Sequence, residues 1–208
     1  MKNIVILISG RGSNMQAIVN AGIPDVRIAA VLSNSATAAG LTWAAERGIP
    51  TDSLNHKDFA SRSAFDRAMM EKIDAYQPDL VVLAGFMRIL TPEFCTRYEG
   101  RLMNIHPSIL PSFTGLHTHE RALAAGCRVA GCTIHFVTSE LDCGPIISQG
   151  VVPIFDNDTA DDIAARVLKV EHRLFPQAVA DFAAGRLKIE GNRVINSRNQ
   201  PEDRPLLA

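Results

Sequence analysis

The chain has 208 residues, of which 47% are hydrophobic, and its 21 basic and 22 acidic side chains give a formal net charge of −1. The length fits one well-buried domain, and the balanced charge without a basic block argues against a nucleic-acid partner. The first apolar run, NIVILIS, is too short to span a membrane and leads into SGRGSN rather than a cleavage site, so we expect a cytoplasmic protein that acts on small molecules.

The first hundred residues alternate between predicted strands and helices. Runs rich in Val, Ile and Leu, each of the length of a strand buried on both faces, occur at residues 3–9, 27–34, 80–86 and 101–106. Helical patterns between them end at Gly22, at Gly48 and before Pro78, and Ser13 or Asn14 is the expected cap of the first helix. This alternation predicts parallel strands joined by right-handed crossovers.

The pattern changes after residue 117. HERALAAG predicts a short helix, and VAGCTIHFV and IISQGVVPI predict an antiparallel pair of strands. A long helical pattern follows from Thr159 to Ala184, which Pro176 is expected to kink or split. We therefore predict a single-domain, Rossmann-like α/β fold over residues 1–196, with a mostly parallel sheet, an antiparallel addition in the C-terminal half and a flexible tail at 197–208.

A glycine loop, ISGRGSN, follows the first strand and opens the first helix. It does not fit the dinucleotide fingerprint, because Met15 replaces the third glycine and no acidic residue ends the second strand. It does not fit the ATP-type loop either, because no Gly-Lys-Ser/Thr follows. A compact phosphate site at Gly12, Ser13 and Asn14 remains, and its alternative is a plain strand-to-helix turn.

The fourth predicted strand ends in two polar side chains, Asn104 and His106, just before Pro107. Strand alternation points both to the same face, at the sheet edge where ligands bind in open parallel sheets. An amide can hold a developing oxyanion and an imidazole can move a proton near neutral pH, as acyl transfer requires. The alternative is a structural histidine beside a turn-forming asparagine.

Asp142 precedes a Cys-Gly-Pro turn and is the candidate carboxylate partner of His106. If its loop folds over the strand end, Asp142 orients the imidazole and stabilises its cationic form; otherwise it is an ordinary turn residue. A metal site would have to use His117 and His119 with His106 or His135, but no recognised zinc spacing is present, so we expect none.

Taken together, SGRGSN, LAGFMRIL, NIHPSILPSFTGLHTHERAL and HFVTSELDCGPII resemble, in order and spacing, the phosphoribosylglycinamide formyltransferase family, which are folate-dependent enzymes of purine synthesis. The resemblance runs from about residue 3 to about residue 190. It implies a formyltransferase fold with a phosphate-binding half near residues 1–100 and a folate-binding and catalytic half near 101–196. It also implies direct formyl transfer from 10-formyltetrahydrofolate, as co-substrate, to the substrate amine, without a metal or a covalent intermediate.

The resemblance assigns roles to individual residues. Asn104 would hydrogen-bond the formyl oxygen, His106 would stabilise the tetrahedral intermediate or relay its proton, and Asp142 would position His106 and a water molecule. The phosphorylated substrate would be held by Gly12, Ser13, Asn14, Lys169 and Glu171, with Glu171 the better partner for its amine. The folate would be held by Arg62, Met87, Arg88, Ile89, Leu90, Asn104, Thr138, Ser139, Glu140, Leu141 and Asp142.

The chain departs from the family pattern at Ser112, Phe113 and Thr114, where the loop is expected to be looser, and at Ser139 and Cys143. A sugar formyltransferase and a non-catalytic nucleotide-binding module remain alternatives. The methionyl-tRNA enzyme, with its extra C-terminal RNA-contacting domain, does not fit this length. Nothing in the sequence decides between a monomer and a homodimer.

Overall fold

The structure, a computed structural model, describes residues 1–198. The chain divides into two compact units, one made of residues 1–104 with 137–139 and the other of residues 105–136 with the chain from residue 140 onward. Strand β5 (Leu102–His106) gives its first three residues to the first unit and its last two to the second.

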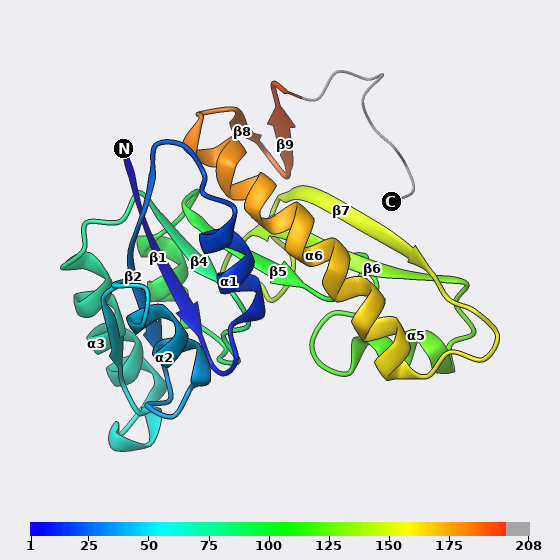
Figure 1. Cartoon of the computed structure of the whole chain (residues 1–208), viewed down its shortest axis with the longest axis horizontal. Coiled ribbons are helices and arrows are strands. Elements are labelled where there is room, and N and C mark those ends of the chain that lie inside the picture. The colour runs from blue at the N-terminus through cyan, green and yellow to red at the C-terminus, as the bar shows by residue number, and fades with distance from the viewer. Residues whose placement is uncertain (199–208) are drawn as a thin grey trace. The chain divides into compact units, whose positions relative to one another are not determined.

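The first unit contains a parallel sheet in the order β3-β2-β1-β4-β5 (Figure 1). Its strands are β1 (Lys2–Ile8), β2 (Val26–Ser33), β3 (Thr51–Ser53) and β4 (Leu80–Leu83), together with the start of β5. Central strands of parallel sheets are covered on both faces, and all four residues of β4 are buried. The four predicted strand runs of this half and their parallel pairing are therefore confirmed.

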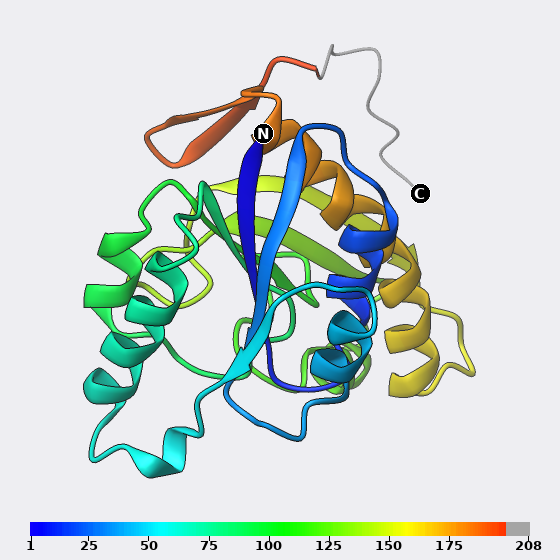
Figure 2. The ribbon, with the colours of Figure 1, turned by 60° about the vertical axis from the view of Figure 1, so that its left-hand side comes forward.

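The helices of the first unit are α1 (Ser13–Asn20), α2 (Ala39–Ala45), α3 (Arg62–Asp74) and α4 (Pro92–Arg97). α3 and α4 lie side by side (Figures 1 and 2). The hydrophobic core includes Phe65 and Met69 of α3, Phe94 of α4 and Tyr98, the C-cap of α4. The Ser61 side chain caps α3 by accepting a hydrogen bond from the Ala64 N–H at 3.1 Å.

The predicted cap of the first helix is wrong. Gly12, in the left-handed conformation at φ +68°, is the N-cap of α1, and Ser13 and Asn14 lie inside the helix. A left-handed glycine turns the loop after β1 into the helix, so no extended serine or asparagine is needed at the N-cap.

The second unit contains the antiparallel pair β6 (Val129–Phe136) and β7 (Ile146–Pro153), as predicted, with Thr133 opposite Gln149. A hairpin of β8 (Leu187–Glu190) and β9 (Arg193–Asn196) extends this part of the sheet in the order β6-β7-β9-β8. The sequence did not predict this hairpin, whose strands are short and largely exposed.

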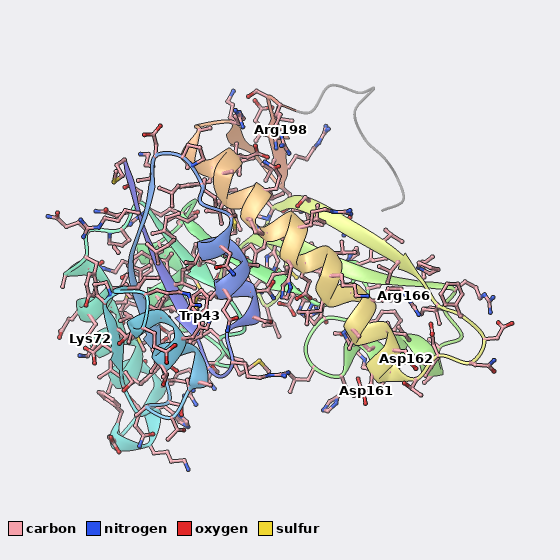
Figure 3. All side chains as sticks on the ribbon, viewed as in Figure 1. Trp43, Lys72, Asp161, Asp162, Arg166 and Arg198 are labelled. Atoms are coloured by element: carbon pink, nitrogen blue, oxygen red, sulfur yellow. The ribbon has the colours of Figure 1, made fainter. Side chains whose placement is uncertain are left out.

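Helix α6 (Ala160–Ala183) lies along β6 and β7 (Figure 1), and α5 (Thr118–Ala124) is the short helix predicted before β6. Thr159 and Asp162 form a capping box at the start of α6. Asp162 and its neighbour Asp161 are labelled in Figure 3. Pro176 does not split the helix: it is buried within one continuous α6, where the packed apolar face outweighs the lost hydrogen bond.

The two described residues that follow β9 bond to the chain at and just after the end of α6. The Ser197 N–H donates to the Arg186 carbonyl at 3.1 Å, and the Arg198 guanidinium lies 3.3 Å from the buried Asp181 carboxylate. The rest of the predicted flexible tail lies outside the described residues. Among residues 1–198, none of the helices combines the length and the apolar character needed to cross a membrane.

Candidate active site

The glycine loop of the first unit has the geometry of an anion site. Gly12 is the last residue of the short loop between β1 and α1, and the Gln16 N–H bonds back to the Gly12 carbonyl at 2.9 Å. The first N–H groups of an α-helix point out of its start rather than back along it, and the positive end of the helix dipole faces the same way. Such a helix start binds phosphate and carboxylate groups.

A pocket of about 300 Å³ lies over this loop within the first unit. Besides the predicted Gly12, Ser13 and Asn14, it is lined by Ser9, Gly10, Arg11, Ala84, Gly85 and Met87. Sequence reasoning missed Arg11, the one cationic residue among those that line this pocket. Its position between the two glycines of the loop was the available signal, because an arginine there suits a bidentate phosphate contact.

The predicted folate segment of the first unit exposes apolar side chains. Met87 and Ile89 are 65% and 56% exposed, whereas the Arg88 guanidinium lies over the Phe65 ring at 5.4 Å. Arg62 is the exposed first residue of α3. Met87 and Ile89 are thus accessible to a ligand at the exit of β4.

The predicted loop wall at residues 138–142 is divided between the units: Thr138 and Ser139 belong to the first, and Glu140, Leu141 and Asp142 to the second. Leu141 is 54% exposed, and the Cys143 N–H bonds to the Glu140 carbonyl at 3.4 Å, which closes a turn around Asp142. Asp142 itself has the left-handed backbone conformation, at φ +54°, which aspartate tolerates better than most residues.

Asn104 and His106 are both carried by β5, as predicted. His106 is buried, and within the second unit its Nδ1 atom lies 3.6 Å from Oδ2 of Asp142; both side chains are 8% exposed. The same Oδ2 atom accepts a hydrogen bond from the Gly115 N–H at 2.9 Å. The structure thus brings the predicted imidazole and carboxylate together.

The second nitrogen of His106 is also engaged. Its Nε2 atom lies 3.0 Å from the Phe113 carbonyl oxygen, and because a carbonyl only accepts, Nε2 carries the hydrogen. Phe113 has a left-handed backbone, at φ +55°, an uncommon conformation for a bulky residue. The ring is therefore oriented on one side by Phe113 and on the other by Asp142.

His135 on β6 is a neighbour of this pair that sequence reasoning placed only among metal candidates. Burial lowers its pKa; a hydrogen bond to the Phe136 carbonyl and the charge of Asp142 act in the opposite direction, while the charge of His106 lowers the pKa further. His135 is thus a buried, neutral imidazole in the electrostatic field of both candidate catalytic groups.

The segment after His106 is held by hydroxyl groups. The buried Thr133 hydroxyl donates to the Ser108 carbonyl at 2.7 Å and accepts from the Leu110 N–H at 3.0 Å. The Gln149 side chain donates to the Thr133 hydroxyl at 3.0 Å and to the Leu110 carbonyl at 2.9 Å. The Thr118 hydroxyl donates to the Pro107 carbonyl at 2.6 Å. These bonds fix the loop in which the His106 partner Phe113 lies.

Lys169 and Glu171, both predicted to contact the substrate, lie on α6 of the second unit. Lys169 is exposed and Glu171 is buried, because two residues along a helix differ by about 200° in direction. Burial raises the pKa of the Cys132 thiol to about 12, and the nearby Glu171 carboxylate adds to this effect. One ligand on the buried side of α6 can meet Glu171 but not Lys169.

The histidines of the alternative metal site lie in different surroundings. His117 has a 75% exposed side chain and pairs with Glu120 at 3.6 Å, whereas burial lowers the pKa of His119, which lines a different pocket of the second unit. Within the part of the chain that the structure describes, no group of three His, Cys, Asp or Glu side chains is placed to hold a metal ion.

An α/β fold that carries a buried histidine–carboxylate pair is typical of enzymes that use proton transfer and charge stabilisation to move a group between substrates. The chain belongs to the formyl transferase family, whose model matches residues 2–179.

Individual members of this family are similar to the chain over most of its length. The chain is 52% identical over 193 residues to phosphoribosylglycinamide formyltransferase of Escherichia coli, covering 91% of each protein. It is 44% identical over 192 residues to the bovine trifunctional purine biosynthetic protein adenosine-3; the aligned region covers 91% of this chain and 19% of the longer bovine protein. The crystal structure of glycinamide ribonucleotide transformylase 1 from Symbiobacterium toebii superimposes with a TM-score of 0.91 at 46% identity, covering 94% of both chains.

Proposed function

We propose that this protein transfers the formyl group of 10-formyltetrahydrofolate to the amine of N1-(5-phospho-D-ribosyl)glycinamide in purine biosynthesis. The observation that carries the proposal is the 52% identity to the E. coli phosphoribosylglycinamide formyltransferase over 91% of both chains. The buried His106–Asp142 pair supports it, because the transfer needs a group that can stabilise charge and handle a proton near neutral pH.

In the proposed reaction the substrate amine attacks the formyl carbon and gives a tetrahedral intermediate. The Asn104 amide would donate to the developing oxyanion, and the His106 ring, held by Asp142, would stabilise it or relay its proton. A proton passes from the attacking nitrogen to N10 of the folate, and the bond from the formyl carbon to N10 breaks. The sequence of steps uses no metal ion and no covalent enzyme intermediate.

Binding roles follow the same assignment. Gly12, Ser13 and Asn14 would hold the phosphate at the start of α1, and the buried Glu171 would hold the amine end of the substrate. The folate would contact the exposed segment Met87–Leu90, with Arg62 near its carboxylates and residues 138–142 as the second wall. We infer a cytoplasmic enzyme of small-molecule substrates that acts as a monomer or a homodimer.

The test is a turnover assay with the purified protein, 10-formyltetrahydrofolate and the phosphoribosyl glycinamide, with the formylated product followed by mass spectrometry. We expect product in wild type and a large loss of rate in His106→Ala. Binding of both substrates without any transfer would instead favour a non-catalytic module. Transfer to an amino sugar in preference to the glycinamide would favour a sugar formyltransferase.

A further inference from the structure

Ser9 lies between two segments of the first unit to which the proposed function gives different substrates. The loop from Gly10 to Asn14 follows it in the chain, and the folate segment begins at Met87. The Ser9 hydroxyl oxygen accepts a hydrogen bond from the Met87 N–H at 2.8 Å and the hydroxyl donates to Oδ1 of Asn34 at 2.6 Å. One side chain therefore joins the start of the phosphate loop to the start of the folate segment.

The direction of both hydrogen bonds is fixed by their chemistry. A backbone N–H only donates and an amide oxygen only accepts, so the single hydroxyl hydrogen points to Asn34 and a lone pair points to Met87. Asn34 is 8% exposed and directly follows β2, so it is a well-held acceptor. The Ser9 hydroxyl is thus oriented from both sides.

The hydroxyl acts where the backbone ladder between β1 and β4 ends. The Ala84 N–H donates to the Leu7 carbonyl at 2.9 Å, and the Ser9 N–H donates to the Gly85 carbonyl at 3.1 Å. Gly85 then adopts a left-handed conformation, at φ +77°, which turns the chain out of the strand direction. The next connection, from Met87, is made to the Ser9 side chain instead of to a backbone carbonyl.

Both segments also line one pocket, the space of about 300 Å³ over the glycine loop, which Ser9 and Met87 share with Gly12 and its neighbours. We infer that Ser9 is a positioning residue that couples the phosphate loop to the folate segment, so that each holds the other in its binding geometry. This inference rests on the proposed function, which assigns the two segments to the two substrates.

Ser9→Ala removes both hydrogen bonds without adding bulk. We expect KM to rise for both the phosphorylated substrate and the folate, each by roughly 2- to 10-fold, which is the range for one lost hydrogen bond, while kcat changes less. Ser9→Thr keeps the hydroxyl and should restore both KM values. Ser35→Ala is the matched control, since the Ser35 hydroxyl contacts the Thr37 hydroxyl at 3.0 Å, and it should behave as wild type.

A second readout does not depend on turnover. Hydrogen exchange of the amides at residues 85–90 should be faster in Ser9→Ala than in wild type, and inorganic phosphate at saturation should slow the Met87 amide in wild type but not in the variant. A rise of KM for one substrate only, a fall of kcat with both KM values intact, or an unchanged Met87 exchange rate would overturn the coupling. Absence of formyl transfer in wild type would refute the proposed function, whereas the exchange comparison would still decide the role of Ser9.

Discussion

The carboxylate of Asp142 reaches His106 from a loop distant in sequence, with Oδ2 of Asp142 3.6 Å from Nδ1 of His106. This separation is longer than a direct hydrogen bond, so the carboxylate acts on the ring by charge or through one bridging water. The Gly115 N–H, at 2.9 Å from the same oxygen, holds the carboxylate in place. The backbone of residues 113 and 115 therefore orients both members of the pair.

Removing the charge of this carboxylate tests its role. Asp142→Asn keeps an oxygen that can accept from Gly115 but cannot stabilise a cationic ring, and we expect kcat to fall by roughly 10²- to 10⁴-fold with little change in KM for the phosphorylated substrate. Steady-state kinetics measure both constants. His117→Ala is the control, since His117 is exposed and pairs with Glu120. Wild-type turnover in Asp142→Asn would contradict the assigned role.

The hydroxyl of Thr133 should matter for both stability and rate. Thr133→Val has nearly the same shape but leaves the Leu110 N–H and the Ser108 carbonyl without this partner, which costs about 1–3 kcal/mol for a buried polar group. We expect a lower midpoint of urea unfolding and a lower kcat, because the loop that orients His106 loosens. Thr133→Ser keeps the hydroxyl and should recover most of both. An unchanged midpoint in Thr133→Val would show that the network does not hold this loop.

The strands of the parallel sheet could be predicted because their apolar runs are continuous, as in β4, whose four residues are all buried. The β8–β9 hairpin was missed because LKIE and RVIN are only four residues long and largely exposed, so they lack the long buried apolar run by which the other strands were predicted. The split expected at Pro176 does not occur, because packing outweighs the cost of a proline inside a helix: its neighbours Phe175 and Val179 are fully buried.

For the site, residue types could be predicted but not all neighbours. The distance between His106 and Asp142 depends on the turn that the Glu140–Cys143 hydrogen bond closes. Residue propensities predict that a turn forms there but not where it lies relative to His106. His135 was missed as their neighbour because the sequence shows it only as one position of a strand that is buried almost throughout, and its distance from His106 and Asp142 depends on how β6 packs.

Gly12 should be required by the phosphate loop. Gly12→Ala places a side chain at φ +68°, at a cost of about 1–2 kcal/mol, and its Cβ would lie 3.0 Å from the Met15 side chain. We expect a higher KM for the phosphorylated substrate with little change in kcat. Gly22→Ala is matched to it, because Gly22 also has a left-handed backbone, at φ +55°, but has open space around its Cβ position. It should lose stability without a change in KM; equal KM effects in the two variants would rule out a specific role of Gly12.

The lowered pKa of His135 predicts how stability depends on pH. Because burial keeps the folded-state pKa below the unfolded value of about 6.5, the unfolded chain binds the proton first as pH falls. The free energy of unfolding should therefore be highest above about pH 6.5 and decrease below it, with at most about 1.4 kcal/mol per pH unit from this group. In His135→Gln, urea unfolding from pH 7.5 to 5.5 should show a shallower decrease. Parallel curves for the two proteins would show that His135 does not contribute.

Helix geometry separates the two α6 candidates for the substrate amine. Glu171 is buried and Lys169 is exposed, so we expect Glu171→Gln, which keeps the shape and removes the charge, to raise KM for the phosphorylated substrate by roughly tenfold or more, as for a lost charged hydrogen bond. Lys169→Ala should leave KM near the wild-type value. The folate KM, measured in the same assays, should not change in either variant, because the amine is not part of the folate. A larger effect of Lys169→Ala than of Glu171→Gln would place the substrate on the exposed side of α6 and refute this assignment.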